Sequence, residues 1–365
     1  SAPHQSEYSI LGYGQAMRFE KTIIHRMIMP YAVGTVQGAA GLSVVCATED
    51  HGPTVIADPP YTRGHRLLDG PGGCMALVAD PDTPSQLWAV MGCFVGYKFQ
   101  GAGIYRIRGA ETLAEAAAYA VSGGLERAAD LPFAHRIGVV RRAGRRYLVA
   151  ANLAADKTDA ADWSKPGAVY AAELAAGEGP IALRPVLPGI HRNHGFLVTR
   201  FEGKSSVLIG CAEGLFALDL EDGGPAWASR KVLPHEVSEI AVADLDGDGA
   251  DELVTIEPFH GSALRAYRGK GGGWTPFWEA EISFGHCVLA GTFLGRPSVL
   301  VSNRTGSKDL VLFQFDQGAP ARPTAIVVDA GAGAANMLVL PFEGRDRIFS
   351  ANQAAGELVM YTPVR

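Results

Sequence analysis

The sequence predicts an all-β fold, a seven-bladed β-propeller that forms a single domain over residues 1–365. Short strands rich in Val, Leu and Ile alternate with turns rich in Gly, Asp and Pro, which is typical of all-β proteins. A unit of strand, tight turn, strand and a looser strand pair recurs at intervals of roughly 50 residues, the size of a four-stranded blade. A pair of β-sandwiches is the competing fold, but it would not repeat one register seven times.

The units are aligned on their first strands. These begin near Tyr31, Cys74, His135, His194, Ser238, His286 and Asn336. The N-terminal segment from Tyr8 to Phe19 is expected to pair with the last blade and close the ring, which leaves few unpaired strand edges. Three stretches depart from the repeat: a helical pattern at 112–121, a Pro/Gly-rich segment at 50–70 and a polar insertion at 154–165.

Composition and charge indicate which partners and which cellular compartment to expect. The net charge is −6 with no basic stripe, so we expect no nucleic-acid partner. No run of about 18 apolar residues is present, so no membrane partner is expected either. The five cysteines lie mostly inside apolar strands, which favours buried free thiols and a reducing compartment. We therefore expect a cytoplasmic protein, with a removed secretory signal as the open alternative.

An acidic loop is the most specific motif of the chain. Asp244, Asp246 and Asp248 occupy alternate positions of a glycine-containing turn, and Glu252 or Asp251 could close the ligand set. Several carboxylate oxygens at this spacing suit Ca²⁺. Because the loop joins a first to a second strand, we expect a structural calcium site on the face opposite the histidines. A solvated turn without a cation is the alternative.

Histidines precede several first strands at the same register. His135, His194 and His286 align, and first strands of a propeller line its central channel, so their imidazoles should converge and could bind a transition metal such as Zn²⁺. Glu213 and Glu257 follow second strands, whose exits open on the same face, and could ligate or support that metal. Histidines that are merely hydrogen-bonded or contact a substrate are the alternative.

The acidic loop resembles the calcium loops of FG-GAP and VCBS-type propeller repeats, and only this blade carries the full pattern. Together with the ring of histidines, it makes the chain similar to the propeller domain of aldos-2-ulose (1,5-anhydrofructose) dehydratases. That resemblance implies a metal in the propeller and elimination of water from keto-sugars. Those enzymes carry additional cupin-like domains with no counterpart in this sequence, which puts a second, isomerase step in doubt. Propeller polysaccharide lyases are a weaker resemblance.

The function predicted is that of a metal-dependent carbon–oxygen lyase acting on a keto-sugar or sugar acid, with a small molecule or an oligosaccharide as substrate. A divalent metal would stabilise the enolate formed when the α-proton leaves. His191, His235 and Tyr97 are candidate bases, and Lys98 could assist the departing oxygen. The alternatives are a non-catalytic propeller that binds a glycan or a protein, and a metal-dependent hydrolase.

Overall fold

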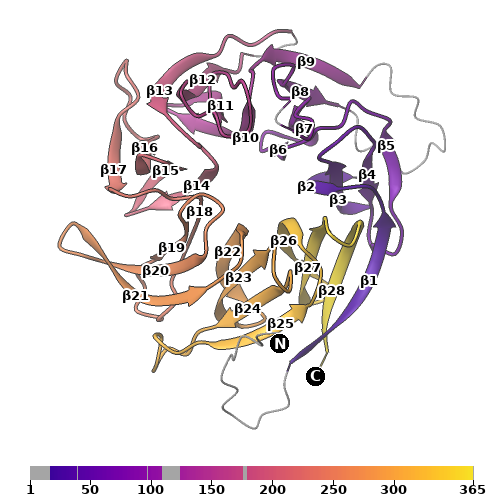
Figure 1. The fold of residues 1–365 in the computed structure, drawn as a ribbon, viewed down its shortest axis with the longest axis vertical. Helices are drawn as coiled ribbons and strands as arrows, with labels where there is room; N and C mark the ends of the chain where they lie inside the picture. The colour runs from indigo at the N-terminus through magenta and orange to yellow at the C-terminus, as the bar shows by residue number, and fades with distance from the viewer. Residues whose placement is uncertain (1–16, 39, 97, 109–123, 176–178, 365) are drawn as a thin grey trace.

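The computed structural model describes residues 17–38, 40–96, 98–108, 124–175 and 179–364. Within these ranges the chain forms seven four-stranded antiparallel sheets and no helix. The sheets stand as blades around one axis (Figure 1). This confirms the predicted all-β, seven-bladed propeller.

Six blades are continuous in sequence, and each runs outward from the axis in chain order. Their strands are β2 (Pro30–Gly38), β3 (Gly41–Thr48), β4 (Thr54–Ala57) and β5 (His65–Leu68); β6 (Ala76–Asp80), β7 (Thr83–Met91), β8 (Gly103–Ile107) and β9 (Leu125–Asp130); β10 (Ala134–Arg142), β11 (Arg145–Asn152), β12 (Gly167–Glu173) and β13 (Arg184–Ile190); β14 (Gly195–Phe201), β15 (Lys204–Cys211), β16 (Gly214–Asp219) and β17 (Ser229–Leu233); β18 (Glu239–Ala243), β19 (Glu252–Glu257), β20 (Ala263–Lys270) and β21 (Gly273–Glu281); β22 (Gly285–Phe293), β23 (Arg296–Asn303), β24 (Leu310–Gln314) and β25 (Thr324–Asp329).

The seventh blade joins the two ends of the chain. It contains β26 (Ala334–Phe342), β27 (Arg345–Asn352), β28 (Glu357–Val364) and, outermost, β1 (Arg18–Arg26). Arg18 pairs with Val364 and Arg26 with Glu357, so the N-terminal strand closes the ring as predicted. The first part of the expected closing segment, from Tyr8, and the helical pattern at 112–121 lie outside the described residues.

Burial follows position within a blade. The first strands β2, β6, β10, β14, β18, β22 and β26 contact one another in that cyclic order and so line the central channel (Figure 1). Second strands such as β19 and β23 are covered on both faces by neighbouring blades, which explains their continuous apolar runs. Outer strands such as β13 are largely exposed. All five cysteines are buried and free, as the sequence predicted.

Candidate metal centre in the channel

β-Bulges aim side chains at the axis. In β2, β10, β22 and β26 the register with the second strand shifts after the first residue. The residue left without a partner in each strand is Tyr31, His135, His286 and Ala335, respectively. A bulge bends the strand and redirects the extra side chain. The same local feature in four blades therefore places equivalent residues at the channel.

Four imidazoles meet there. His194, His260 and His286 each offer a ligand atom within 4.8 Å of the others. The ring of His135 lies against that of His194, with centroids 4.5 Å apart. His135, His194 and His286 are almost fully buried, at 3%, 1% and 1% exposure. His260 arrives from the loop after β19 with a φ of 48°, a conformation that His adopts more readily than most residues.

The hydrogen bonds around Tyr31 assign the protons of two imidazoles. His286 Nδ1 lies 2.6 Å from the carbonyl oxygen of Ala335, so Nδ1 must donate. Nε2 of His286 then accepts from the Tyr31 hydroxyl at 3.0 Å. Because Tyr31 has one proton, Nε2 of His135, 3.2 Å away, donates to the tyrosine oxygen. The second nitrogen of His135, Nδ1, is left with a bare lone pair that is buried and unpaired.

His194 is oriented by a buried carboxylate. Its Nδ1 lies 2.6 Å from Glu239 Oε1 and 3.3 Å from the Ser238 carbonyl oxygen, so Nδ1 donates and Nε2 carries the lone pair. Glu239 is also paired with Arg136 at 2.9 Å, and Arg136 donates to the Met75 carbonyl oxygen. Burial raises the pKa of Glu239, but the charge of Arg136 and the hydrogen bonds from His194 and Arg136 outweigh it and hold the pKa below its usual value.

The imidazoles are held neutral. Burial lowers the pKa of His135, His194 and His286, and it lowers that of His260 to about 2. The positive charge of Arg136 acts in the same direction on all four. Neutral imidazoles are the form that binds metals.

Unpaired nitrogens show that the residues fit a metal ion. His135 Nδ1, His194 Nε2 and His260 Nε2 are buried and have no hydrogen-bond partner within the described part of the chain. Buried polar atoms are nearly always paired, so three orphans in one cluster require an explanation. Nitrogen ligation of a divalent transition ion would explain the two on His194 and His260, which lie with His286 in one group of possible ligands. Glu239 would hold the far side of the His194 imidazole, as carboxylates commonly do.

The two glutamates expected near the metal have other partners. Glu213 binds the backbone N–H and Nδ1 of His191, at 2.9 and 2.6 Å. Glu257 contacts Nε2 of His235 at 3.1 Å. Its remaining contacts are with Thr255, Tyr267 and Arg265. Among described residues, the histidine group that could hold a metal includes neither glutamate, because each is held by partners in loops and strands outside it.

Lys98, His191 and His235 are not members of the histidine group that could hold a metal. Lys98 is exposed and forms an isolated bridge with Phe94, and Tyr97 lies outside the described residues. Sequence reasoning missed Tyr31, Glu239 and His260. Tyr31 could have been found, because it occupies the register of His135 and His286. His260 follows a second strand, where no repeated signal marks it.

The acidic loop lies between β18 and β19, a connection at the opposite end of the blade from the residues preceding first strands. Asp244, Asp246 and Glu252 bring oxygens within 4.8 Å of one another, whereas Asp248 is outside that group and accepts from the backbone N–H of Ala250. The loop therefore clusters three of the four expected ligands. Burial, with a contribution from Asp246, raises the pKa of Glu252 to about 7.

Arg268 supplies a positive charge at this loop. It is paired with Asp246, and its Nε lies 3.8 Å from Glu252. Asp244 meanwhile accepts from the N–H groups of Gly247 and Gly249, at 2.6 and 3.0 Å. The loop is thus shaped by its own hydrogen bonds as well as by its suitability for a cation.

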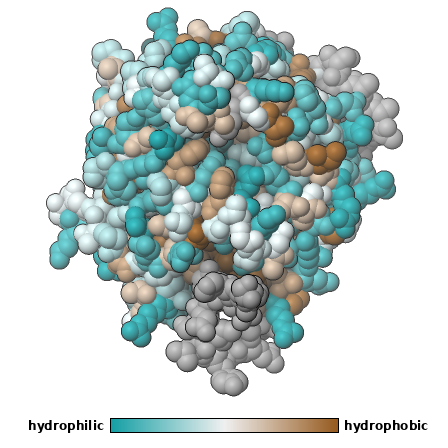
Figure 2. All heavy atoms as spheres, in the orientation of Figure 1, coloured by the Kyte–Doolittle hydropathy of each residue, from teal (hydrophilic) through white to brown (hydrophobic). Residues whose placement is uncertain are grey.

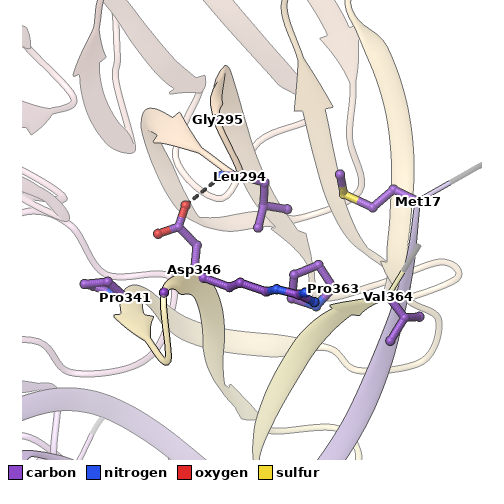
Figure 3. A pocket seen from close by; sticks show the side chains of 9 residues that line it. Met17, Leu294, Gly295, Pro341, Asp346, Pro363 and Val364 are labelled. Carbon is purple, nitrogen blue, oxygen red and sulfur yellow. Dashed lines mark hydrogen bonds between the residues drawn. The ribbon is translucent and has the colours of Figure 1, made fainter.

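The surface viewed along the axis carries scattered apolar residues among hydrophilic ones (Figure 2). A cavity of about 650 Å³ lies at the turns β22–β23 and β26–β27, beside the ends of β1 and β28 (Figure 3). Asp346 there accepts from the backbone N–H of Leu294 at 2.7 Å. The channel histidines do not line this cavity. Among the described residues, no helix is long and apolar enough to cross a membrane.

Comparisons with known proteins identify the fold only. No protein-family model and no curated protein sequence matches the chain. Solved structures do match. The β-propeller domain of Cps50 (Swd1) from Myceliophteria thermophila aligns at 13% identity over 93% of this chain and 99% of its own, with a TM-score of 0.57. The AfRom2 CNH domain aligns at 12% identity over 95% and 99%, with a TM-score of 0.56. The N-terminal part of BBS1, solved in complex with ARL6, aligns at 14% identity over 95% and 98%, with a TM-score of 0.57. At such identities, what the chain shares with these proteins is the seven-bladed propeller fold.

Proposed function

We propose that this propeller binds a divalent transition metal, Zn²⁺ or a similar ion, through its channel histidines, and that the metal centre binds a small ligand bearing a carbonyl or carboxylate group. The observation that carries this proposal is a group of three histidines, His194, His260 and His286, whose ligand atoms lie within 4.8 Å of one another, with the Nε2 atoms of His194 and His260 buried and unpaired within the described part of the chain. His286 belongs to the same cluster through its contact with Tyr31.

Three histidines would bind the metal, and Glu239 and Tyr31 would support them. His194 and His260 would hold the ion through their unpaired Nε2 atoms, and His286 would bind it through Nε2 in place of accepting the Tyr31 proton. Glu239 would keep the Nδ1 proton of His194 in place. A bound divalent ion supplies a Lewis acid that polarises a carbonyl or carboxylate oxygen. Tyr31 keeps its proton in the absence of ligand, because burial raises the pKa of its hydroxyl.

Elimination chemistry is the second candidate, and one observation favours it. His191 and His235 are each paired with a carboxylate, Glu213 and Glu257. A carboxylate that accepts from one ring nitrogen fixes the tautomer and leaves the lone pair on the other nitrogen, which suits a general base. On this proposal the protein is a carbon–oxygen lyase for a keto-sugar or sugar acid. Hydrolysis of a glycan by the same groups, and glycan or protein binding without turnover, are the other outcomes.

Metal analysis tests the first proposal. Purified protein, stripped with a chelator and titrated with Zn²⁺, should take up about one ion per chain tightly, as a site with three imidazole ligands does. His194→Ala and His286→Ala should lose that uptake, whereas Asp246→Ala, at the acidic loop, should retain it. No uptake by the wild type, or equal uptake by all variants, contradicts the proposal.

Product analysis separates the candidate activities. Zinc-loaded protein would be incubated with anhydro-keto-sugars, 3-keto-glycosides and uronides. A conjugated product absorbing in the ultraviolet supports the lyase, and saturated hydrolysis products support the hydrolase. Tight binding of an intact glycan with no product supports the non-catalytic alternative.

A further inference from the structure

Arg304 is a positive charge beside the channel that has no acidic partner among the residues the structure describes. It follows β23, and its backbone N–H donates to the carbonyl oxygens of Ser283 and Phe284, both at 3.1 Å. Its side chain is half-buried and makes no hydrogen bond or ion pair with any described residue. Arg136, in contrast, is paired with Glu239 at 2.9 Å.

Ring contacts connect this guanidinium to the histidines. It lies over the ring of Phe284, 6.0 Å from its centroid. Phe284 stacks on His260 at 4.5 Å, and His260 lies 5.2 Å from His286. After burial, the charge of Arg304 is the next-largest cause of the lowered pKa of His286, and it also lowers that of His260. Its field therefore reaches the candidate metal ligands.

The charges around the channel do not balance. The imidazoles are neutral, and the charge of Arg136 is compensated by Glu239. The charge of Arg304 also acts on the carboxyl group of Glu49. That group accepts a hydrogen bond from Gln353, and burial raises its pKa, which disfavours its negative charge. Arg304 forms no ion pair with a carboxylate of a described residue, although its charge acts on Glu49. A divalent ion would add to this positive charge, so an anionic ligand is favoured.

We propose that Arg304 binds the carboxylate of the ligand, so that the channel takes an organic acid such as a sugar acid in preference to a neutral sugar. This inference rests on the proposed metal-dependent function and selects its ligand class. A planar guanidinium matches the two oxygens of a carboxylate with two parallel hydrogen bonds. Phe284, 36% exposed despite its size, lies beside the guanidinium, whose N–H groups have no acceptor among the described residues.

Ligand binding to zinc-loaded protein tests this proposal. D-Glucuronate and D-glucose differ in the carboxylate, and D-glucose 6-phosphate tests phosphate as the other source of negative charge. By calorimetry, glucuronate should bind at least about tenfold more tightly than glucose. Arg304→Gln should weaken glucuronate binding by roughly 10- to 100-fold, the effect of one charge-assisted interaction, and should leave glucose binding unchanged. Arg304→Lys should retain part of the difference.

A matched control and a separate zinc titration distinguish the outcomes. Arg345, exposed at the β26–β27 turn, provides the control, and Arg345→Gln should bind glucuronate as the wild type does. Equal affinities for glucuronate and glucose, equal losses in both variants, preference for the phosphate, or no binding of any of the three compounds would overturn the carboxylate assignment. The zinc titration fails only if the proposed metal function fails, so the two proposals can be rejected independently.

Discussion

Replacing His260 with Asn should make the metal-free protein less sensitive to acid. Burial, with the positive charges of Arg304 and Arg136, lowers the pKa of His260 to about 2. In the unfolded chain an imidazole has a pKa near ~6.5. Below that pH the unfolded state binds a proton that the folded state does not. The stability from neutral His260 is therefore complete above the unfolded pKa and is lost as the pH falls towards the folded one.

The size of the effect follows from this difference. Each pH unit below the unfolded pKa costs about 1.4 kcal/mol per imidazole, so His260 alone costs about 2 kcal/mol between pH 7 and pH 5. The pKa values of His135, His194 and His286 are lowered as well, so the wild type should lose more than this. Asn is the appropriate replacement because it tolerates the φ of 48°, whereas Ala would add backbone strain.

Urea unfolding in the presence of a chelator measures this. Between pH 7 and pH 5, the free energy of unfolding of the wild type should fall by about 2 kcal/mol more than that of His260→Asn. His65→Asn, which removes an exposed imidazole from β5, is the control and should follow the wild type. If the wild type and His260→Asn lose the same free energy, or if the wild type loses none, the imidazoles are not held neutral and the reasoning fails.

Two further predictions concern the carboxylates. Glu239→Gln removes the charge that orients His194 and should lower zinc affinity by roughly 10- to 100-fold in a chelator competition. Glu236→Gln, which removes only the partner of Arg192, is the control and should leave zinc affinity unchanged. Equal zinc affinities of the two variants would refute the positioning role of Glu239. Calcium should raise the melting temperature of the wild type but not of Asp246→Ala, whose zinc uptake should stay normal, because a ligand that binds only the folded state stabilises it. No response to calcium in the wild type would show that the acidic loop is held by Arg268 and its own hydrogen bonds.

The strands could be predicted because blade position controls burial. A second strand is covered on both faces, so it reads as a continuous apolar run, as in β19 and β23. β23 follows a two-residue turn and β19 follows the acidic loop, so the sequence marks both the strand and its place in the blade. Closure by β1 was predicted for a physical reason as well, because a last blade without it would present an unpaired edge.

The candidate site was predictable only where it follows the repeat. His135, His194 and His286 share a register, and the structure brings them together. His260 enters from a connection after a second strand, where the blades differ in length and composition. Glu213 and Glu257 were placed on the correct kind of connection, yet their side chains bind His191 and His235. The position of a residue in the repeat predicts the face of the propeller on which its side chain lies. The direction of that side chain depends on which hydrogen-bonding partners are within reach, and the repeat does not reveal these.

The β-bulges in the first strands explain how a repeated strand pattern brings polar side chains together at the channel. An ordinary strand alternates its side chains between the two faces of the blade, and neither direction points along the channel. A bulge at the second residue of β2, β10, β22 and β26 frees one side chain from that alternation in each blade. The side chains freed in this way form hydrogen bonds: the Tyr31 hydroxyl bonds to both His135 and His286, and the Ala335 carbonyl oxygen accepts from His286. Substitution at one bulge therefore changes one member of a shared cluster while the ring of blades persists, which is how a symmetrical fold can hold an asymmetrical cluster of side chains.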